Sequence, residues 1–101
     1  MIPVIQWEKR ARTDREAIFR YLYKEAGLLI ASATDDRFIS MVGILRENPL
    51  AGTKAGTAEK QRKLVVSRFP FIIVYGVENS VVRILRVLHT SRKLAERYSK
   101  S

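Results

Sequence analysis

Three apolar runs rich in β-branched and aromatic residues follow one another closely in the second half of the chain, at 62–67, 70–77 and 81–89. The connections between them, 67–69 and 78–80, span only a few residues. Short runs of this composition with tight connections are typical of sequential antiparallel strands. This feature constrains the fold most, because it predicts a three-stranded antiparallel meander.

The last run alternates regularly, which predicts the two faces of its strand. We expect one face to carry Val82, Ile84, Arg86 and Leu88, and the other to carry Arg83, Leu85, Val87 and His89. Both faces are largely apolar, which is typical of a strand covered on both sides. The run is therefore expected in the middle of the sheet.

The first half of the chain has a helical period instead. Residues 3–7 predict a short opening strand. Thr13 and Glu16 then have the spacing of a capping box, so we expect a helix with Thr13 as its N-cap. Gly27 is expected to end this helix, because glycine is the preferred residue just after a helix C-terminus.

A second helix is predicted over 32–47, where an apolar stripe recurs at helical spacing. The stripe consists of Phe38, Met41, Val42 and Leu45. Asn48 and Pro49 end this helix, because the residue before proline disfavours the helical region. The two helices are expected to form an antiparallel hairpin with one shared apolar face. Residues 50–61, rich in glycine and small residues, predict a mobile loop.

Together these predictions give an α+β fold in a single domain over residues 1–101. An N-terminal strand, an antiparallel helical hairpin and the three-stranded meander form one curved sheet with its helices. Residues 90–101 are polar and basic, and we expect them to form a short helix that orders on binding.

The composition excludes several classes of site. The chain has no cysteine, so it offers neither a disulfide nor a thiolate nucleophile, and His89 is its one histidine. We therefore expect no metal site and no cofactor. The longest apolar stretch, 69–75, is too short to span a bilayer, and the first residues lack the pattern of a signal peptide. We expect a cytoplasmic protein that does not act at a membrane.

The net charge of +9 is concentrated in the second half of the chain. Residues 1–51 hold eight Lys/Arg and seven Asp/Glu, which gives +1, whereas residues 52–101 hold eleven and three, which gives +8. A field of this sign attracts polyanions, either nucleic acid or a strongly acidic protein segment. A generic basic protein without such a partner is the alternative.

The segment 62–89 resembles the RelE/ParE toxin superfamily, the toxic half of bacterial type II toxin–antitoxin pairs. The matching stretches are RKLVV at 62–66, PFIIVY at 70–75 and VRILRVLH at 82–89. The last stretch, followed by the basic residue Arg92, is the most specific. The helical hairpin and the NPLAG stretch at 48–52 agree with the family layout, so the resemblance covers nearly the whole chain.

The resemblance implies one of two actions. Toxins similar to RelE are ribonucleases that cut messenger RNA on the ribosome, whereas toxins similar to ParE poison DNA gyrase without known hydrolysis. Both are silenced in a hetero-oligomer by an antitoxin whose acidic, partly disordered segment wraps the toxin. The chain is nearer the ParE-like branch, because the ribonuclease branch usually has an arginine at the position of Ile72, three residues before the tyrosine that matches Tyr75.

Metal-free RNA cleavage needs an acid and a base for proton transfer, and cations beside the phosphoryl oxygens. His89 is the candidate acid or base, because histidine ordinarily titrates near neutral pH. Arg62, Arg68 and Arg86 are the candidate cations, and Arg68 or Arg86 would have to replace the arginine missing at Ile72. A packing role for His89 at the end of a strand is the alternative.

The residues predicted to contact the target or a nucleic acid are Lys54, Arg62, Lys63, Arg68 and Arg92. Arg86 lies in a mostly apolar strand and needs a carboxylate partner or a route to water. Its candidate partners on the helices are Glu16, Glu25, Asp35 and Asp36. An acidic antitoxin helix is expected to bury Leu64, Val66 or neighbouring apolar side chains.

From the sequence we therefore expect the toxin of a type II toxin–antitoxin pair that resembles ParE. It would inhibit DNA gyrase and arrest growth, through its basic C-terminal half and its helical hairpin. The alternative is a RelE-like mRNA endoribonuclease that acts on the ribosome without a metal, so whether the chain is an enzyme stays open. A second alternative is a non-toxic basic nucleic-acid-binding module, which predicts salt-sensitive binding to free nucleic acid and no growth arrest.

Overall fold

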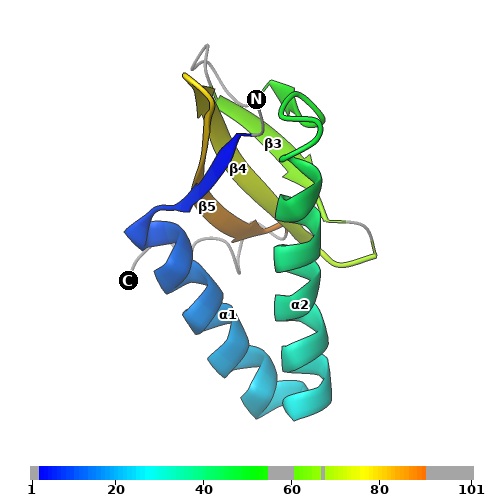
Figure 1. Cartoon of the computed structure of the whole chain (residues 1–101). Coiled ribbons are helices and arrows are strands. Elements are labelled where there is room, and N and C mark those ends of the chain that lie inside the picture. Colours follow the sequence, from blue (N-terminus) through cyan, green and yellow to red (C-terminus); the bar gives the residue numbers. More distant parts are fainter. Residues whose placement is uncertain (1–2, 55–60, 67, 91–101) are drawn as a thin grey trace.

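The computed structural model describes residues 3–54, 61–66 and 68–90. In chain order the elements are β1 (Val4–Trp7), α1 (Lys9–Ala26), α2 (Leu28–Ile44), β2 (Thr53–Lys54), β3 (Gln61–Val65), β4 (Phe71–Glu78) and β5 (Val81–His89). Within these residues the strands form one sheet in the order β1-β5-β4-β3-β2 (Figure 1). β1 runs parallel to β5, and the other neighbours are antiparallel. The predicted α+β fold and meander are confirmed.

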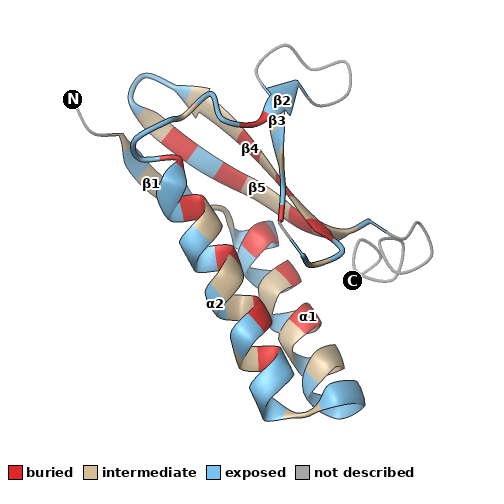
Figure 2. Ribbon diagram, turned by 90° about the vertical axis from the view of Figure 1, so that its right-hand side faces the viewer, coloured by how far each residue is buried: buried red, intermediate tan, exposed pale blue. Residues whose placement is uncertain are grey.

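The two helices pack against one face of the sheet and extend beyond it as a hairpin (Figures 1 and 2). Apolar side chains from both layers form the core: Ile18, Phe38, Val42 and Leu45 from the helical half, and Ile73, Tyr75, Val82, Ile84 and Val87 from the strands. Met41, the remaining member of the predicted stripe, packs against this core from a half-buried position. The stripe is therefore confirmed as the inner face of α2 and of its C-cap residue, Leu45.

α1 begins earlier than the sequence predicts. It starts at Lys9, so Thr13 is an exposed residue inside the helix and the predicted capping box is wrong. Glu8 is the N-cap and makes no side-chain cap hydrogen bond. Its backbone N–H instead donates to the Ile84 carbonyl oxygen at 2.9 Å. The helix start is thus anchored to β5, and this tertiary hydrogen bond takes the place of a local cap.

Gly27 alone connects α1 to α2. Its φ of 94° is unfavourable for residues with a side chain, and its N–H donates at 3.1 Å to two carbonyl oxygens in the last turn of α1. Gly27 therefore ends α1 as predicted. α2 starts at Leu28 rather than Ser32 and ends at Ile44 rather than Glu47. The early start has no periodic signal, because the first turn of α2 is apolar and yet exposed.

A β-bulge in β5 changes the faces predicted for this strand. The pairing with β4 skips Leu85: Arg86 lies opposite Val74, whereas Ile84 lies opposite Tyr75. One extra residue reverses the alternation, so the predicted faces are wrong beyond the bulge. Val87 and His89 share the helix-facing side with Val82 and Ile84, and Arg86 and Leu88 lie on the opposite side.

We call the sheet face away from the helices the outer face. β5 lies inside the sheet as expected, between β1 and β4. On its outer face, however, Arg83 is exposed and Arg86 and Leu88 are half-buried. No helix in the described parts of the chain covers this face (Figure 2). The prediction of cover on both sides is therefore wrong, because both helices lie on the same side.

Two predicted segments fall partly outside the described residues. In the predicted loop 50–61, Thr53 and Lys54 form the short strand β2 against β3, and 55–60 lie outside the description. A strand of two residues is too short to produce a periodic pattern. The helix predicted for 90–101 also lies outside it, apart from Thr90 in a bend. No helix among the described residues is long and apolar enough to cross a membrane.

Candidate functional site

A row of residues crosses the outer face of the sheet where β3, β4 and β5 lie side by side. Val74 is paired with Lys63 on one side and with Arg86 on the other. Adjacent strands are about 4.8 Å apart, so the two basic residues are about 10 Å apart with Val74 between them. Beside this row lies a hollow of about 440 Å³, which we call the sheet hollow. It is lined by Glu8, Lys9, Arg10, Gln61, Val74, Leu85 and Arg86.

Arg86 is held by a buried carboxylate next to this hollow. Its Nε donates to Asp14 Oδ2 at 2.7 Å and its Nη2 donates to Asp14 Oδ1 at 3.0 Å. The Asp14 side chain is 3% exposed, and Oδ2 also accepts the backbone N–H of Val87 at 3.0 Å. The hydrogen bond with Asp14, together with its charge, holds the pKa of Arg86 above its ordinary value. Arg86 therefore ties β5 to α1.

Asp14 was not among the predicted partners of Arg86. The four candidates were Glu16, Glu25, Asp35 and Asp36, and that prediction is wrong. Asp35 instead accepts two hydrogen bonds from Arg15, at 2.9 and 2.8 Å. The bulge places Arg86 on the outer face, and its side chain reaches Asp14 on α1 at a point where β1 no longer pairs with β5. This meeting depends on tertiary geometry, so no local pattern signals it.

Arg62 is also bonded within the protein. Its Nε and Nη2 donate to the Gly52 carbonyl oxygen at 3.1 and 2.7 Å, and Nη2 donates to the Leu50 carbonyl oxygen at 3.2 Å. The Tyr75 hydroxyl holds the same segment, because it accepts the Gly52 N–H and donates to the Pro49 carbonyl oxygen, both at 2.9 Å. A Cβ on Gly52 would lie 2.8 Å from that hydroxyl oxygen. Arg62 therefore fixes the approach to β2.

His89 lies on the helix-facing side of the sheet. Its ring packs edge-on against Phe71 with centroids 5.0 Å apart, and Phe71 packs edge-on against Phe38 at 5.2 Å. His89 is opposite Phe71, whereas Arg62 is opposite Tyr75, four residues further along β4. At about 3.3 Å per residue, about 13 Å of strand separates the two positions. His89 and Arg62 are therefore not brought together.

The remaining predicted residues are dispersed. Arg68 is exposed in the turn before β4 with a φ of 69°, at the same end of the sheet as His89. Lys54 and Lys63 are exposed on β2 and β3, and Arg92 lies outside the described residues. The described residues contain no group of three or more His, Asp or Glu side chains that could hold a metal ion.

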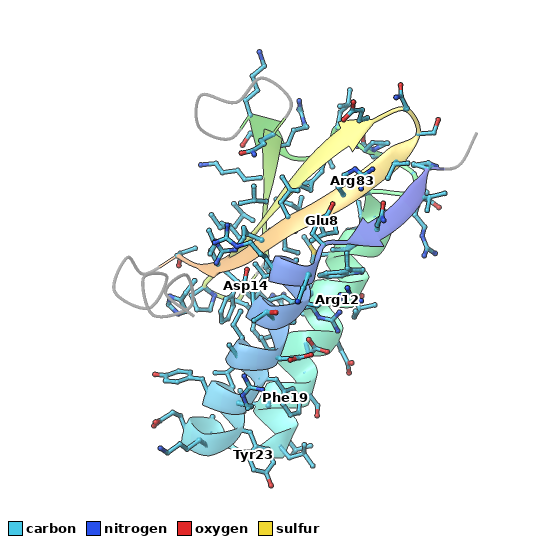
Figure 3. All side chains as sticks on the ribbon, turned by 90° about the vertical axis from the view of Figure 1, so that its left-hand side faces the viewer. Glu8, Arg12, Asp14, Phe19, Tyr23 and Arg83 are labelled. Atoms are coloured by element: carbon cyan, nitrogen blue, oxygen red, sulfur yellow. The ribbon has the colours of Figure 1, made fainter. Side chains whose placement is uncertain are left out.

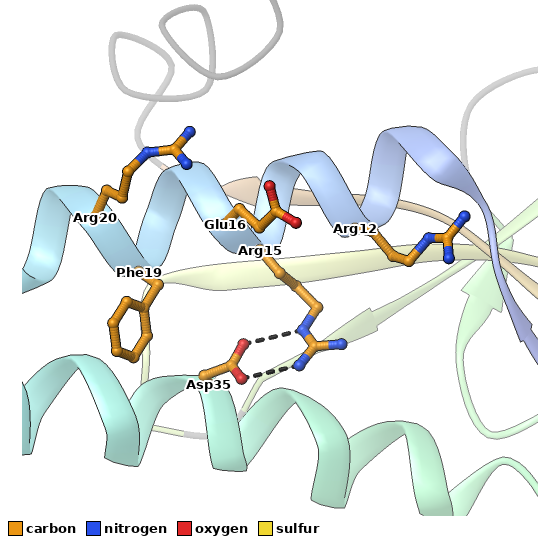
Figure 4. Close-up of a pocket in the computed structure, with 6 residues that line it drawn as sticks. All are labelled: Arg12, Arg15, Glu16, Phe19, Arg20 and Asp35. Carbon is orange, nitrogen blue, oxygen red and sulfur yellow. Dashed lines mark hydrogen bonds and ion pairs between the residues drawn. The ribbon is translucent and has the colours of Figure 1, made fainter.

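The cations that border hollows come largely from α1, and sequence reasoning missed them. A second hollow of about 410 Å³, which we call the hairpin groove, lies between α1 and α2 (Figure 4). It is lined by Arg12, Arg15, Glu16, Phe19, Arg20 and Asp35. α1 has six Lys/Arg and three Asp/Glu, an excess that the half-chain tally concealed because the rest of residues 1–51 holds two Lys/Arg and four Asp/Glu. A charge count for each helix would have revealed it.

Comparison with known proteins agrees with this geometry. The family model of the ParE toxin of the type II toxin–antitoxin system parDE matches residues 5–94. The chain therefore belongs to the ParE toxin family, within the RelE/ParE superfamily. Accordingly, it is a ParE-like toxin of a type II toxin–antitoxin system, in which its partner is an antitoxin.

A solved structure has a similar fold. The chromosomal ParDE toxin–antitoxin system from P. aeruginosa matches with a TM-score of 0.80 and 20% sequence identity, over 89% of this chain and 98% of that chain. A search of curated proteins found no match. At this identity the likeness concerns the fold.

Proposed function

We propose that this toxin inhibits DNA gyrase and is neutralised by an acidic segment of its antitoxin. The observation that carries this choice of mechanism is the internal bonding of Arg62 and Arg86. A ribonuclease would need such cations beside the phosphoryl oxygens of RNA. Releasing Arg86 alone would leave Asp14 buried without its partner, at a cost of about 3–5 kcal/mol. Since gyrase acts in the cytoplasm, we assign the toxin to that compartment.

The outer face of the sheet supports the antitoxin half of this proposal. Val65 is 61% exposed on this face, close to Lys63 and to the half-buried Val74. Val66, one of the side chains expected to contact the antitoxin, is 1% exposed and belongs to the core. An antitoxin segment would therefore bury Val65 rather than Val66, and its carboxylates would face Lys63.

A ribonuclease remains the second candidate because of one observation. Arg68 and His89 lie at the same end of the sheet, and Arg68 keeps a positive φ in an exposed turn. Unfavourable backbone conformations of this kind are frequent at functional sites. A cleavage site would have to be built at this end, with RNA or ribosome contacts supplying further charge.

The test compares two reactions of the purified toxin. We expect it to block supercoiling of relaxed plasmid by gyrase, and to leave ribosome-bound mRNA intact. His89→Phe keeps an aromatic ring against Phe71 and removes the titratable group, so gyrase inhibition should persist unchanged. Adding the antitoxin should restore supercoiling.

The opposite results in these two assays would favour a different function. Cleaved mRNA with active gyrase would contradict the proposal, and a loss of cleavage of about 10²–10⁴-fold in His89→Phe would then assign His89 to acid–base catalysis. Binding to free nucleic acid without either effect would favour the non-toxic binding module instead.

A further inference from the structure

β1 forms one edge of the sheet, and within the described residues its only neighbouring strand is β5 (Figure 3). Its four residues, Val-Ile-Gln-Trp, include no charged side chain and no proline, and its pairing with β5 contains no bulge. Natural proteins commonly protect a sheet edge with one of these three features, because an unprotected edge pairs readily with another strand. β1 has none of them.

The backbone of β1 presents unpaired groups on its outer edge. At the two ends of this segment, the N–H groups of Val4 and Glu8 donate to carbonyl oxygens next to and within β5, both at 2.9 Å. Backbone groups point alternately to the two sides of a strand, so those of Gln6 also point towards β5. The N–H and C=O groups of Ile5 and Trp7 therefore point away from the sheet. They leave two donors and two acceptors at the edge.

These four groups are complementary to the same four groups of a second copy of the chain. When two β1 strands run antiparallel, Ile5 of each copy can lie opposite Trp7 of the other, and each such pair exchanges two hydrogen bonds. Gln6 then lies opposite Gln6 of the second copy, on a two-fold axis, and both copies use the same surface. This register forms four hydrogen bonds between the copies and pairs all the edge groups of Ile5 and Trp7.

The side chains beside the edge suit this register. Ile5 and Trp7 are half-buried on the helix-facing side of the sheet, and a β-branched side chain opposite an aromatic one is a favourable cross-strand pair. A hollow of about 170 Å³ lies next to them, between β1 and α2. Val4 on the outer face and Ile39 on the wall of this hollow are 63% and 47% exposed. A second copy would therefore remove apolar surface from water on both sides of the edge.

We propose that the toxin without its antitoxin forms a symmetric dimer, in which β1 pairs antiparallel with β1 of a second copy. The two five-stranded sheets then form one continuous sheet. The edge itself specifies this occupant, because the register that pairs all four backbone groups is two-fold symmetric. The inference goes beyond the proposed function, and it depends neither on gyrase nor on the chemistry of the antitoxin.

Charge opposes this dimer, which determines its response to salt. Each copy carries +9, so the two copies repel each other. Close to the axis the charge is balanced, because Arg83 donates to Gln6 Oε1 at 2.9 Å and forms an ion pair with Glu8 at 3.2 Å. Salt screens the remaining repulsion. We therefore expect a weak dimer, with a dissociation constant of about 10–100 μM, that becomes tighter as the ionic strength rises.

A disulfide tests the register directly, because the chain has no cysteine of its own. In the proposed dimer Gln6 is at a non-hydrogen-bonded position, where opposite Cα atoms are about 4.5 Å apart and within reach of a disulfide. Gln6→Cys should therefore form a cross-linked dimer under a mild oxidant. Gln61→Cys is the matched control, because Gln61 is an exposed glutamine on β3, with β4 and β5 between it and β1. It should stay monomeric.

Sedimentation equilibrium measures the same contact without a cross-link. Gln6→Glu keeps an acceptor for Arg83 but places two carboxylates opposite each other on the axis, so we expect dimerisation to weaken about two- to fivefold. Gln61→Glu makes the same charge change away from β1 and should not weaken it. In the unmodified toxin, the backbone N–H groups of Ile5 and Trp7 should exchange with solvent more slowly as the protein concentration rises.

Four outcomes would overturn the inference. Equal cross-linking of the two cysteine variants would show association without this register, and a monomer at every concentration up to about 1 mM would exclude the dimer. A dimer that weakens with salt, or that Gln6→Glu leaves unchanged, would be formed by another surface. Thermal unfolding shows whether each variant keeps its fold, and amide exchange of the unmodified toxin decides if one does not. Gyrase inhibition by a purely monomeric toxin would contradict the dimer and leave the proposed function intact.

Discussion

Asp14 is the residue on which the junction between α1 and β5 depends. It accepts two hydrogen bonds from Arg86 and one from the backbone of Val87, and it is almost fully buried. Since the folded-state pKa of Arg86 lies above the pKa that arginine has in an unfolded chain, the stabilisation from its charge is complete at every pH below that unfolded value. It is lost only as the pH rises through the folded-state pKa, so Arg86 contributes no pH dependence near neutrality.

Asp14→Ala should lower the free energy of unfolding by about 3–5 kcal/mol, because it leaves a charged guanidinium and a backbone N–H without their partner. Asp35→Ala removes the partner of Arg15 at a more exposed site, and should cost about 1 kcal/mol or less. Urea unfolding of both variants at pH 7 and pH 9 measures the difference. Equal losses would show that the burial of Asp14 does not matter.

The stability of the β4–β5 hairpin is limited by the backbone conformation of its turn. Asn79 and Ser80 connect the two strands with φ values of 49° and 66°, as a two-residue type I′ turn requires. Asparagine adopts this region readily, whereas serine does so at a cost. The Ser80 carbonyl oxygen also accepts the Val4 N–H at 2.9 Å, so the turn positions β1 as well.

Ser80→Gly should therefore raise the free energy of unfolding by about 0.5–1 kcal/mol, since it relieves the side-chain strain and keeps the carbonyl. The reverse exchange at the connection between α1 and α2, Gly27→Ser, should lower it by about 1–3 kcal/mol, because a φ of 94° with a ψ of 173° is a conformation that residues with a side chain rarely adopt. Thermal unfolding of the two variants provides the measurement. A destabilised Ser80→Gly would mean that the serine side chain contributes more than the strain costs.

At the scale of the whole molecule, the charge in the sequence and the charge offered to partners are distributed differently. Arg62, Arg83 and Arg86 are all in the basic second half, and all three are bonded within the protein. The arginines that line the hairpin groove, Arg12, Arg15 and Arg20, are in the half that appears nearly neutral. A partner therefore meets a field that extends over α1 as well as the sheet.

Arg62 and Lys63 test the distinction between cations that are bonded within the protein and cations that are exposed to a partner. Arg62→Gln should lower the free energy of unfolding by about 1–3 kcal/mol, because the bonds to residues 50 and 52 are lost. It should leave the salt dependence of antitoxin binding unchanged. Lys63→Gln makes the same charge change at an exposed position, so it should leave stability unchanged and weaken that salt dependence. Urea unfolding and affinity measurements at several ionic strengths distinguish the two variants. Identical behaviour of both variants would refute the distinction between bonded and exposed cations.

The sequence by itself determined the features that depend on neighbours along the chain. The stripe of Phe38, Val42 and Leu45, the stop at Gly27 and the three closely spaced strands all follow from local period and backbone preference. The stretches at 62–66, 70–75 and 82–89, which resemble the RelE/ParE superfamily, predicted the family to which the chain belongs. The stripe and the strands are robust features because each repeats over several residues, and the stop follows from the backbone preference of one glycine.

The tertiary structure alone decided which distant groups meet. The parallel pairing of β1 with β5 joins segments more than 70 residues apart, and it anchors the start of α1 without a side-chain cap hydrogen bond. The bulge at Leu85 exchanges the faces of the last strand, so that Arg86 reaches Asp14 and His89 reaches Phe71. A single unpaired residue reverses every later side chain in a strand, and its place is set by packing across the whole sheet. The candidate site therefore took its form from contacts that no local pattern contains.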